Sequence, residues 1–541
     1  MNAADIIAGA LHAAGCRTAY GIPGGEVLAL IEALENAGLS FVLVKHENAG
    51  GFMAEGEWHA MSVAGPSAAP GVLVATLGPG MANAVNVIAN ACQDRVPLIF
   101  LTGCVDEAEA ASYTHQVFDH QAVLRPIVKA SFRVSPGAVG AVMKKAIMLA
   151  GEGQPGPVHI DVPISIAEAE AHEQVPVIDP ATGLRETAAG GPMLEAARVM
   201  LASARRPLMI AGVDAVNEGA GPAIETFCRR FQVPLITSYK AKGLIDEADL
   251  LCLGGAGLSP KADGILMPLI ARADLVLLAG YDPIEMRIGW RDPWEAARAV
   301  EIAAVPRTHG MHQAGATLTG GIAPTLSALG EGVAPQATWT ESETLTARGA
   351  LHEAFAAEPD GWGPATVFHV LRDVMPRETV ATADSGAHRI LLSQIWRCPS
   401  PRTLLQSSGL CTMGCALPLG AGHKRAEPET PVIVFVGDAG LEMGIGELAT
   451  LRDLQLPAIV VVLVDTSLAL IELKQRSGQR ANAGVDFGET DFPAVATAFG
   501  GAGVWVEDVE DLRREAEAAL ARKTFTILAC RIGRRAYDGK F

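Results

Sequence analysis

Short apolar runs alternate with longer segments of helical periodicity along most of the 541-residue chain. The runs are bounded by Gly, Pro or polar residues, a pattern that predicts βαβ units with parallel sheets. The runs form three groups, and each group predicts one sheet. They lie at 41–44, 71–78, 96–103 and 157–163, then at 207–212, 233–238 and 273–280, and finally at 379–386, 403–408, 432–438, 458–465 and 525–532.

Two stretches without this periodicity separate the groups. Residues 167–192 and 331–349 are rich in Pro, Gly, Thr and acidic residues, which is typical of linkers. The pattern therefore predicts an α/β fold of three doubly wound domains with parallel sheets, at 1–168, 190–330 and 350–541. Each of these domains has an ordinary size for a single core.

Composition and charge exclude several classes of protein. Hydrophobic residues make up 49% of the chain, yet no run reaches the length of about 18 apolar residues that a membrane span needs. The formal net charge, 42 minus 60, is −18, which argues against a nucleic-acid or anionic membrane partner. The nine cysteines include no CxxC pair, so we expect free thiols in a reducing compartment. The N-terminus has the pattern of an amphipathic helix and not of a signal peptide, and a soluble cytoplasmic protein is predicted.

Two runs of the third group each end in a carboxylate, Asp438 and Asp465. Ligands of open parallel sheets bind outside the carboxyl ends of the strands, so both acids are expected at one crevice if their strands are neighbours. A helix beginning near Gly444 would add its N-terminal amides, and Gly440 would allow close backbone approach. Two carboxylates beside such amides suit Mg²⁺ bound to a diphosphate. Two solvated acids at strand ends are the alternative that the spacing alone leaves open.

The same segment resembles the fingerprint of thiamine-diphosphate enzymes, Gly-Asp-Gly followed by a strand that ends in Asn-Asn. Gly437 and Asp438 match its first two positions, and Asp465 stands at the second Asn. Ser467 stands where the family uses a backbone carbonyl as the third metal ligand. The resemblance implies thiamine diphosphate and Mg²⁺ as cofactors, with Asp438, Asp465 and Ser467 as metal ligands.

Two positions depart from this fingerprint. Ala439 replaces the last Gly of the triplet, and Val464 replaces the first Asn. An Asp in place of the ligating Asn still supplies a hard oxygen, so the metal site is expected to persist. Ala439 requires a backbone conformation that leaves room for a Cβ.

The resemblance covers essentially the whole chain and is strongest to the catabolic, flavin-free acetolactate synthases of the pyruvate oxidase and pyruvate decarboxylase superfamily. It implies a pyrimidine-binding, a middle and a diphosphate-binding domain, in that order. The matching stretches are HENAGGFMAEG (46–56), TLGPGMANAVN (76–86), YTHQVFDHQAVLRPIVKAS (113–131), LLAGYDPIEM (277–286), DSGAHRILLSQ (384–394), PRTLLQSSGLCTMGCALPLGAG (401–422) and GVDFGETDFPAVATAFGGAG (484–503).

Several site residues follow from this resemblance. Glu47 would hydrogen-bond the cofactor's pyrimidine and activate it, because a carboxyl in an apolar pocket can share a proton. Met413 would wedge the two cofactor rings into their bent arrangement, and the Cys411 carbonyl would hold the 4′-amino group. His388 would contact the diphosphate. The other predicted cofactor contacts are Pro23, Asn83, Gly437, Ala439 and Gly440.

His115 and Gln116 are the predicted catalytic residues around the reacting carbonyl, for proton handling and substrate orientation. In this family the cofactor lies between the first domain of one subunit and the third domain of another. The resemblance therefore implies a homodimer or homotetramer with active sites at the subunit interface and a small 2-oxo acid as substrate. Ile164 stands where biosynthetic members have Lys, and a Trp near Lys474 is missing, which disfavours a branched-chain biosynthetic role.

The sequence of the middle domain indicates that FAD is absent. Flavin-containing members hold FAD with an Arg-Phe-Asp-Asp-Arg-like loop, whereas here the strand at 273–280 runs into Tyr-Asp-Pro-Ile-Glu, residues 281–285. Pro283 restricts this loop, and its two acids would repel a dinucleotide diphosphate. FAD bound through backbone amides elsewhere in the domain is the alternative.

Three functions compete. The first is a carboligase that decarboxylates pyruvate and joins the product to a second carbonyl, as acetolactate synthases do. The second is a simple non-oxidative 2-oxo acid decarboxylase or lyase on the same fold. The third is a catalytically decayed homologue, which the retained Glu47, Asp438 and Asp465 disfavour. A transferase-type enzyme of the first kind is the prediction.

Overall fold

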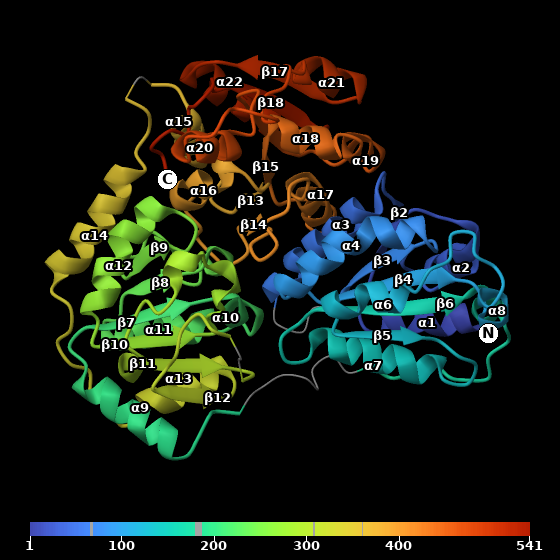
Figure 1. The fold of residues 1–541 in the computed structure, drawn as a ribbon, viewed down its shortest axis with the longest axis horizontal. Helices are drawn as coiled ribbons and strands as arrows, with labels where there is room; N and C mark the ends of the chain where they lie inside the picture. Colours follow the sequence, from blue (N-terminus) through green and yellow to red (C-terminus); the bar gives the residue numbers. More distant parts are fainter. Residues whose placement is uncertain (65–68, 179–186, 307–308, 360) are drawn as a thin grey trace. The chain divides into compact units, whose positions relative to one another are not determined.

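The computed structural model of the chain describes residues 1–64, 69–178, 187–306, 309–359 and 361–541 (Figure 1). These residues form three sheets, each with six strands, and every strand pair is parallel. The α/β fold of three doubly wound domains predicted from the sequence is confirmed. No helix in the described ranges is long and apolar enough to cross a membrane.

The described residues group into two compact units. The first unit holds the residues up to 178 together with 409–429 and 444–456. The second unit holds the residues from 187 to 408 together with 430–443 and 457–541. The domain boundaries at 168, 190, 330 and 350 stay predictions.

The first unit is built on a sheet with the strand order β2-β1-β3-β4-β6-β5. Helices α1 and α7 cover one face of it, and α3 and α4 lie on the other (Figure 1). The strands are β1 (Thr18–Gly21), β2 (Ser40–Leu43), β3 (Gly71–Ala75), β4 (Leu98–Cys104), β5 (Ala130–Arg133) and β6 (Pro157–Pro163). The helices are α1 (Ala3–Ala13), α2 (Leu28–Asn36), α3 (Glu47–Met61), α4 (Pro79–Gln93), α5 (Glu107–Ala110), α6 (His120–Leu124), α7 (Val139–Gly151), α8 (Ile164–Glu168), α17 (Ala416–Ala426) and α19 (Glu447–Asp453).

Helices α3 and α17 cross at unusually short range because glycines stand at the crossing. A Cβ at Gly422 would overlap the carbonyl oxygen of Met53, and one at Gly56 would overlap the carbonyl oxygen of Leu419. Small residues thus let the two backbones touch. This contact fixes the segment that precedes α17 beside the helix that begins at Glu47.

The middle sheet shows how alternation along each strand builds two cores. Leu208 and Ile210 pack with α12 and α14, whereas Met209 and Ala211 pack with α9, α11 and α13 on the opposite face (Figure 1). The strand order is β12-β11-β10-β7-β8-β9. The elements are β7 (Pro207–Ala211), β8 (Leu235–Thr237), β9 (Cys252–Gly255), β10 (Leu275–Ala279), β11 (Ala299–Ala303), β12 (Ala316–Thr319), α9 (Pro192–Ser203), α10 (Val213–Asn217), α11 (Gly221–Phe231), α12 (Pro260–Arg272), α13 (Ile322–Gly330) and α14 (Glu341–Ala354).

The third sheet has the order β14-β13-β15-β16-β18-β17, the same pattern as the first sheet. Chain order reverses between β13 and β15, and this is the position at which doubly wound sheets bind ligands. The elements are β13 (Val380–Ala383), β14 (Leu404–Gln406), β15 (Val432–Gly437), β16 (Ile459–Val464), β17 (Ala502–Val506), β18 (Thr526–Arg531), α15 (Pro364–Val374), α16 (Ala387–Ile395), α18 (Asp438–Gly444), α20 (Ala469–Ser477), α21 (Phe492–Ala498) and α22 (Val509–Leu520).

Two sequence predictions differ from the structure. The predicted linker at 331–349 contains more than the first two turns of α14, which starts with a capping box between Thr340 and Glu343. The helix predicted to begin near Gly444 begins at Asp438, directly after β15, and the chain leaves helical geometry between Gly444 and Gly446 before α19.

Candidate active site

Glu47 is the first residue of α3, and His46 caps this helix by accepting a hydrogen bond from the Asn48 N–H at 3.1 Å. The Glu47 side chain is buried, with Oε2 accepting a hydrogen bond from Asn83 Nδ2 at 2.9 Å. Its other oxygen lies over Gly80, where a Cβ would come within 3.2 Å of Oε1. The structure therefore brings together Glu47 and Asn83, two of the residues predicted to contact the cofactor.

A buried histidine that the sequence reasoning missed lies at the same sheet edge. His120 accepts a hydrogen bond at Nε2 from the Gly78 N–H, at 3.2 Å, and its Nδ1 lies 2.8 Å from Asp161 Oδ1. A backbone N–H can only donate, so Nε2 carries no proton and Nδ1 donates to the carboxylate. These contacts fix one neutral tautomer of His120.

The network continues across the sheet from Asp161. Thr102, the register partner of Asp161 on β4, donates from Oγ1 to Oδ1 at 2.8 Å. His159 Nε2 lies 2.8 Å from the same Thr102 oxygen, and His159 Nδ1 lies 2.7 Å from Ser131 Oγ. Burial lowers the pKa of His159 to about 4, and burial of Asp161 is outweighed by hydrogen bonds led by that from His120, which lower its pKa. The chain of bonds therefore holds a charged carboxylate between two neutral imidazoles.

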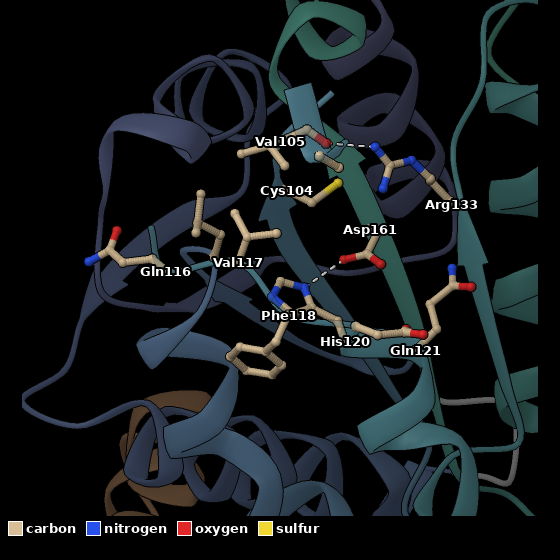
Figure 2. Close-up of a pocket in the computed structure, with 12 residues that line it drawn as sticks. Cys104, Val105, Gln116, Val117, Phe118, His120, Gln121, Arg133 and Asp161 are labelled. Carbon is tan, nitrogen blue, oxygen red and sulfur yellow. Dashed lines mark hydrogen bonds and ion pairs between the residues drawn. The ribbon is translucent and has the colours of Figure 1, made fainter. Parts of the chain in front are cut away.

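His120 and Asp161 line a cavity of about 330 Å³. Figure 2 shows the two side chains facing each other, with Phe118 beside the imidazole and Arg133 on the opposite wall. Arg133 Nη2 donates to the Val105 carbonyl at 2.6 Å. The cavity thus offers one guanidinium, one imidazole–carboxylate pair and an apolar wall, a combination suited to a small polar organic molecule.

Of the two predicted catalytic residues, Gln116 lines this cavity and His115 does not. Gln116 lines it, with φ of 60°, and its carbonyl oxygen closes over Gly78, where a side chain would overlap it. His115 is exposed, does not line the cavity, and lies edge-on to Tyr113 with ring centroids 6.2 Å apart. Pro23 is exposed and follows β1.

The segment with Cys411 and Met413 is held against α4 in the first unit. Asp94 accepts a hydrogen bond from the Gly409 N–H at 2.7 Å, and Asn86 Nδ2 donates to Thr412 Oγ1 at 3.0 Å. Cys411 has a φ of 57°, an uncommon conformation for a residue with a side chain. Met413 is half-buried.

In the second unit, Asp438 directly follows β15 and Asp465 directly follows the adjacent strand β16, so the two acids lie close together as predicted. Asp438 Oδ2 accepts hydrogen bonds from the N–H groups of Asp465 and Thr466, at 3.1 and 2.7 Å. Its Oδ1 accepts from the Ala439 N–H at 2.9 Å. Asp465 Oδ1 accepts from the Ser467 N–H at 3.2 Å. The three predicted metal ligands are therefore neighbours.

Electrostatics at this pair favour a cation. Burial, and then the charge of Asp438, raise the pKa of Asp465 to about 7. Burial also raises the pKa of Asp438, although its backbone hydrogen bonds act in the opposite direction. Two carboxylates that are 4% and 6% exposed and destabilise each other's charge would both be relieved by a divalent ion.

His388 lies beside the same strand end. Its ring packs on Gly386 and Gly437, where added Cβ atoms would come within 2.7 and 3.7 Å of Cε1. Burial, and secondarily Arg389, lower the pKa of His388 to about 3, so the imidazole is neutral. In the part of the chain that the structure describes, His388 Nε2 is buried without a hydrogen-bond partner. A buried polar atom of this kind indicates a site that a ligand completes.

The open question about Ala439 is answered by its backbone. Ala439 lies within α18 and does not have a positive φ, so its Cβ is accommodated. Gly440 is required for a different reason, because a Cβ there would come within 2.5 Å of Asp384 Oδ2. The two oxygen ligands, the orphan nitrogen of His388 and this close-packed turn fit a Mg²⁺ ion with a diphosphate.

The two acids predicted to exclude FAD, Asp282 and Glu285, accept hydrogen bonds from nearby backbone N–H groups. Asp282 caps the turn at Pro283–Glu285 by accepting a hydrogen bond from the Ile284 N–H, at 3.0 Å. Glu285 accepts one from the Lys240 N–H at 3.1 Å. Both side chains are buried. Absence of FAD stays a prediction.

Comparison with known proteins gives the family. Models of the thiamine pyrophosphate enzyme N-terminal TPP-binding domain, central domain and C-terminal TPP-binding domain match residues 1–123, 194–329 and 384–530. An acetolactate synthase large subunit of Parasynechococcus marenigrum (strain WH8102) is 30% identical, over 99% of this chain and 88% of that protein. The catabolic acetolactate synthase of Raoultella terrigena is 26% identical, over 96% and 93%. A probable 2-ketoarginine decarboxylase of Pseudomonas aeruginosa is 29% identical, over 96% and 91%.

The three domain models follow one another in the order that the family resemblance implied, and similarity to acetolactate synthases spans nearly the full length of the chain. The chain therefore belongs to the thiamine-diphosphate enzymes and is an acetolactate synthase-like member of that family.

Proposed function

We propose that this enzyme decarboxylates pyruvate and joins the two-carbon product to a second carbonyl compound, with Mg²⁺ and thiamine diphosphate as cofactors and without FAD. The observation that carries the proposal is the buried pair Asp438 and Asp465, each directly after one of two adjacent strands, which suits a Mg²⁺–diphosphate group. Full-length similarity to acetolactate synthases, one of them catabolic, supports the carboligase assignment.

The chain's own residues have distinct parts in this proposal. Asp438 and Asp465 would hold the metal through carboxylate oxygens, and Ser467 through its carbonyl. Glu47, anchored by Asn83, would share a proton with the cofactor's pyrimidine through its free oxygen Oε1. Bound thiamine diphosphate supplies the electron sink for loss of CO2 from a 2-oxo acid.

We assign the substrate to the cavity beside His120. Arg133 would pair with the carboxylate of the 2-oxo acid, and Gln116 would orient it, since both line the cavity. His120 is locked as a neutral imidazole by Gly78 and Asp161, so it would shape the cavity and not donate a proton. For His115, which is exposed, we keep the proposed role in proton transfer.

The experiment that tests the proposal is product analysis. Purified enzyme with thiamine diphosphate and Mg²⁺ would be given pyruvate, and the products would be quantified by chromatography together with released CO2. Acetolactate formed with one CO2 for two pyruvates supports the carboligase, whereas acetaldehyde formed with one CO2 for each pyruvate overturns it.

A second candidate is a decarboxylase of a longer 2-oxo acid. The similarity to a probable 2-ketoarginine decarboxylase favours it, and Asp119 at the cavity rim offers a carboxylate for a cationic tail. The same assay with 2-oxo acids bearing a guanidinium or a plain alkyl tail separates the two functions through the ratio of kcat/KM values.

We further propose that the enzyme works in the cytoplasm as a homodimer or homotetramer, with one cofactor shared by two copies of the chain. Nine free cysteines suit a reducing compartment. Light scattering coupled to size exclusion, with and without cofactor, would measure the oligomeric state, and a monomer that turns over pyruvate would contradict the shared site.

A further inference from the structure

A cluster of metal-ligating side chains lies in the middle domain, away from the residues assigned above. Glu301 belongs to β11, between β10 and β12, and His309 and His312 belong to the connection from β11 to β12. One ligand atom from each residue lies within 4.8 Å of the other two. His312 Nε2 is 3.9 Å from Glu301 Oε1, and the two imidazole centroids are 4.4 Å apart.

His312 is the unusual member of this cluster. It is 5% exposed, and neither of its ring nitrogens has a hydrogen-bond partner in the described structure. The rings of Tyr281 and Trp294 lie against it, with centroids 5.4 and 5.0 Å away. Burying a polar group without a hydrogen-bond partner destabilises a fold, and native proteins seldom leave one unsatisfied. A ligand that accepts the electron pair of His312 would remove this cost.

We propose that Glu301, His309 and His312 bind a divalent transition-metal ion of the Zn²⁺ class. Two imidazoles and one carboxylate form a ligand set typical of zinc, and neutral imidazole does not suit Mg²⁺. Metal–ligand bonds of about 2.0–2.2 Å place tetrahedral ligands roughly 3.3 Å apart, so the cluster contracts slightly on binding. Water occupies the fourth position.

Binding of a metal ion has to change the hydrogen bonding of His309. Its Nδ1 accepts a long hydrogen bond, 3.3 Å, from the Met311 N–H. Coordination through Nε2 moves the ring proton to Nδ1 and ends this bond, whereas coordination through Nδ1 replaces it. In either case the ion ties the β11–β12 connection to β11 and stabilises the middle domain.

The site differs chemically from the Asp438–Asp465 pair, so the two can be loaded separately. Oxygen ligands alone serve the Mg²⁺ ion of the cofactor, whereas the nitrogen-containing cluster selects a softer ion. Metal-free enzyme would therefore be saturated first with Mg²⁺ and thiamine diphosphate, and then titrated with Zn²⁺. Bound zinc would be measured by elemental analysis after gel filtration.

The wild-type enzyme is expected to bind one Zn²⁺ per chain, and His312→Gln to bind at least tenfold more weakly. His352→Gln, an exposed histidine of the same unit, is the matched control and should bind like the wild type. His159→Gln tests the other histidine cluster and should also leave the stoichiometry unchanged. Equal zinc uptake by His312→Gln, or no uptake by the wild type, overturns the proposal.

A second readout guards against a variant that misfolds. Because Trp294 lies 5.0 Å from His312, Co²⁺ should quench its fluorescence, and Trp294→Phe should lose this quenching while keeping the Co²⁺ stoichiometry. Co²⁺ bound by wild type without any difference in quenching between the wild type and Trp294→Phe would place the ion elsewhere and overturn the assignment. Cofactor binding and pyruvate turnover by His312→Gln should match the wild type, which separates this test from the test of the proposed function.

Discussion

Replacing Glu47 by Gln removes a carboxylate while keeping the size of the side chain and its hydrogen bond to Asn83. The Gln amide oxygen can accept the hydrogen bond that Asn83 Nδ2 now donates at 2.9 Å. The amide nitrogen then takes the place of Oε1 over Gly80, where no backbone donor opposes it. The substitution is therefore close to isosteric and creates no donor–donor conflict among the described residues.

The expected magnitudes follow from these contacts. A hydrogen bond to a charged acceptor contributes about 1 kcal/mol more than one to a neutral acceptor, so stability should fall by roughly 1 kcal/mol. Proton sharing by a positioned side chain contributes about 10²- to 10⁴-fold to rate, which corresponds to about 3–5 kcal/mol of activation free energy. The loss in turnover should therefore exceed the loss in stability several-fold on the free-energy scale.

The assay compares Glu47→Gln with a control on the same pair of helices. Glu55 is 1% exposed and accepts a hydrogen bond from Asn90 Nδ2, also at 2.9 Å, and its Oε1 lies 3.4 Å from His59 Nε2. Glu55→Gln therefore replaces a similarly held carboxylate by an amide away from the proposed site. Turnover of pyruvate, calorimetric affinity for thiamine diphosphate and thermal midpoint would be measured for both. Near-wild-type kcat in Glu47→Gln, or an equal loss in Glu55→Gln, would refute the assigned role.

Three further predictions concern the metal pair, the buried network and the helix crossing. Asp438→Asn turns an amide nitrogen toward at least one of three backbone N–H donors, so Mg²⁺-dependent cofactor binding should be lost in calorimetry; unchanged affinity contradicts the metal assignment. Burial lowers the pKa of His159 to about 4 in the folded protein, from 6.5 in the unfolded chain. Between pH 6.5 and about 4 only the unfolded chain binds this proton, so the free energy of unfolding should fall as the pH drops through that range. The loss amounts to about 3 kcal/mol, and urea unfolding of His159→Gln should show a flatter pH dependence. Gly422→Ala should destabilise the enzyme by about 1–3 kcal/mol in thermal unfolding because its Cβ meets the Met53 carbonyl, whereas Gly151→Ala, in open space, should be neutral.

The apolar runs identified most of the interior strands because strands buried on both faces consist largely of apolar residues. The strands without such a run are mostly edge strands, where one side meets solvent and polar residues are tolerated: β5, β9, β12 and β17. Two interior strands were also missed. β1 has Thr18 and Gly21 at its two ends, which leaves only two apolar residues in sequence, and Glu301 interrupts the apolar pattern of β11.

The three candidate site acids could be proposed from the sequence because each stands next to a recognisable local pattern. Glu47 follows a strand within a familiar motif, and Asp438 and Asp465 end two apolar runs. Their partners were less accessible. Asn83 was named as a cofactor contact, but its hydrogen bond to Glu47 joins two helices 36 positions apart and has no local signature. The hydrogen-bond network around Asp161 was not predicted. An acidic residue within a mostly apolar, fully buried strand is the sequence feature that could have indicated it.

Apolar periodicity along the chain predicted the fold class and three α/β domains, because alternation is a local property of the sequence. The order of the domains and thiamine diphosphate as a cofactor were predicted through the resemblance of several motifs to a known family. Folding of the chain pairs His120 with Asp161 and places Gln116, but not His115, at the cavity. It likewise brought Glu301, His309 and His312 together in the middle domain. These relations depend on strand register and on loops that return over sheet edges, where residues distant in the chain meet through backbone geometry that no local pattern encodes.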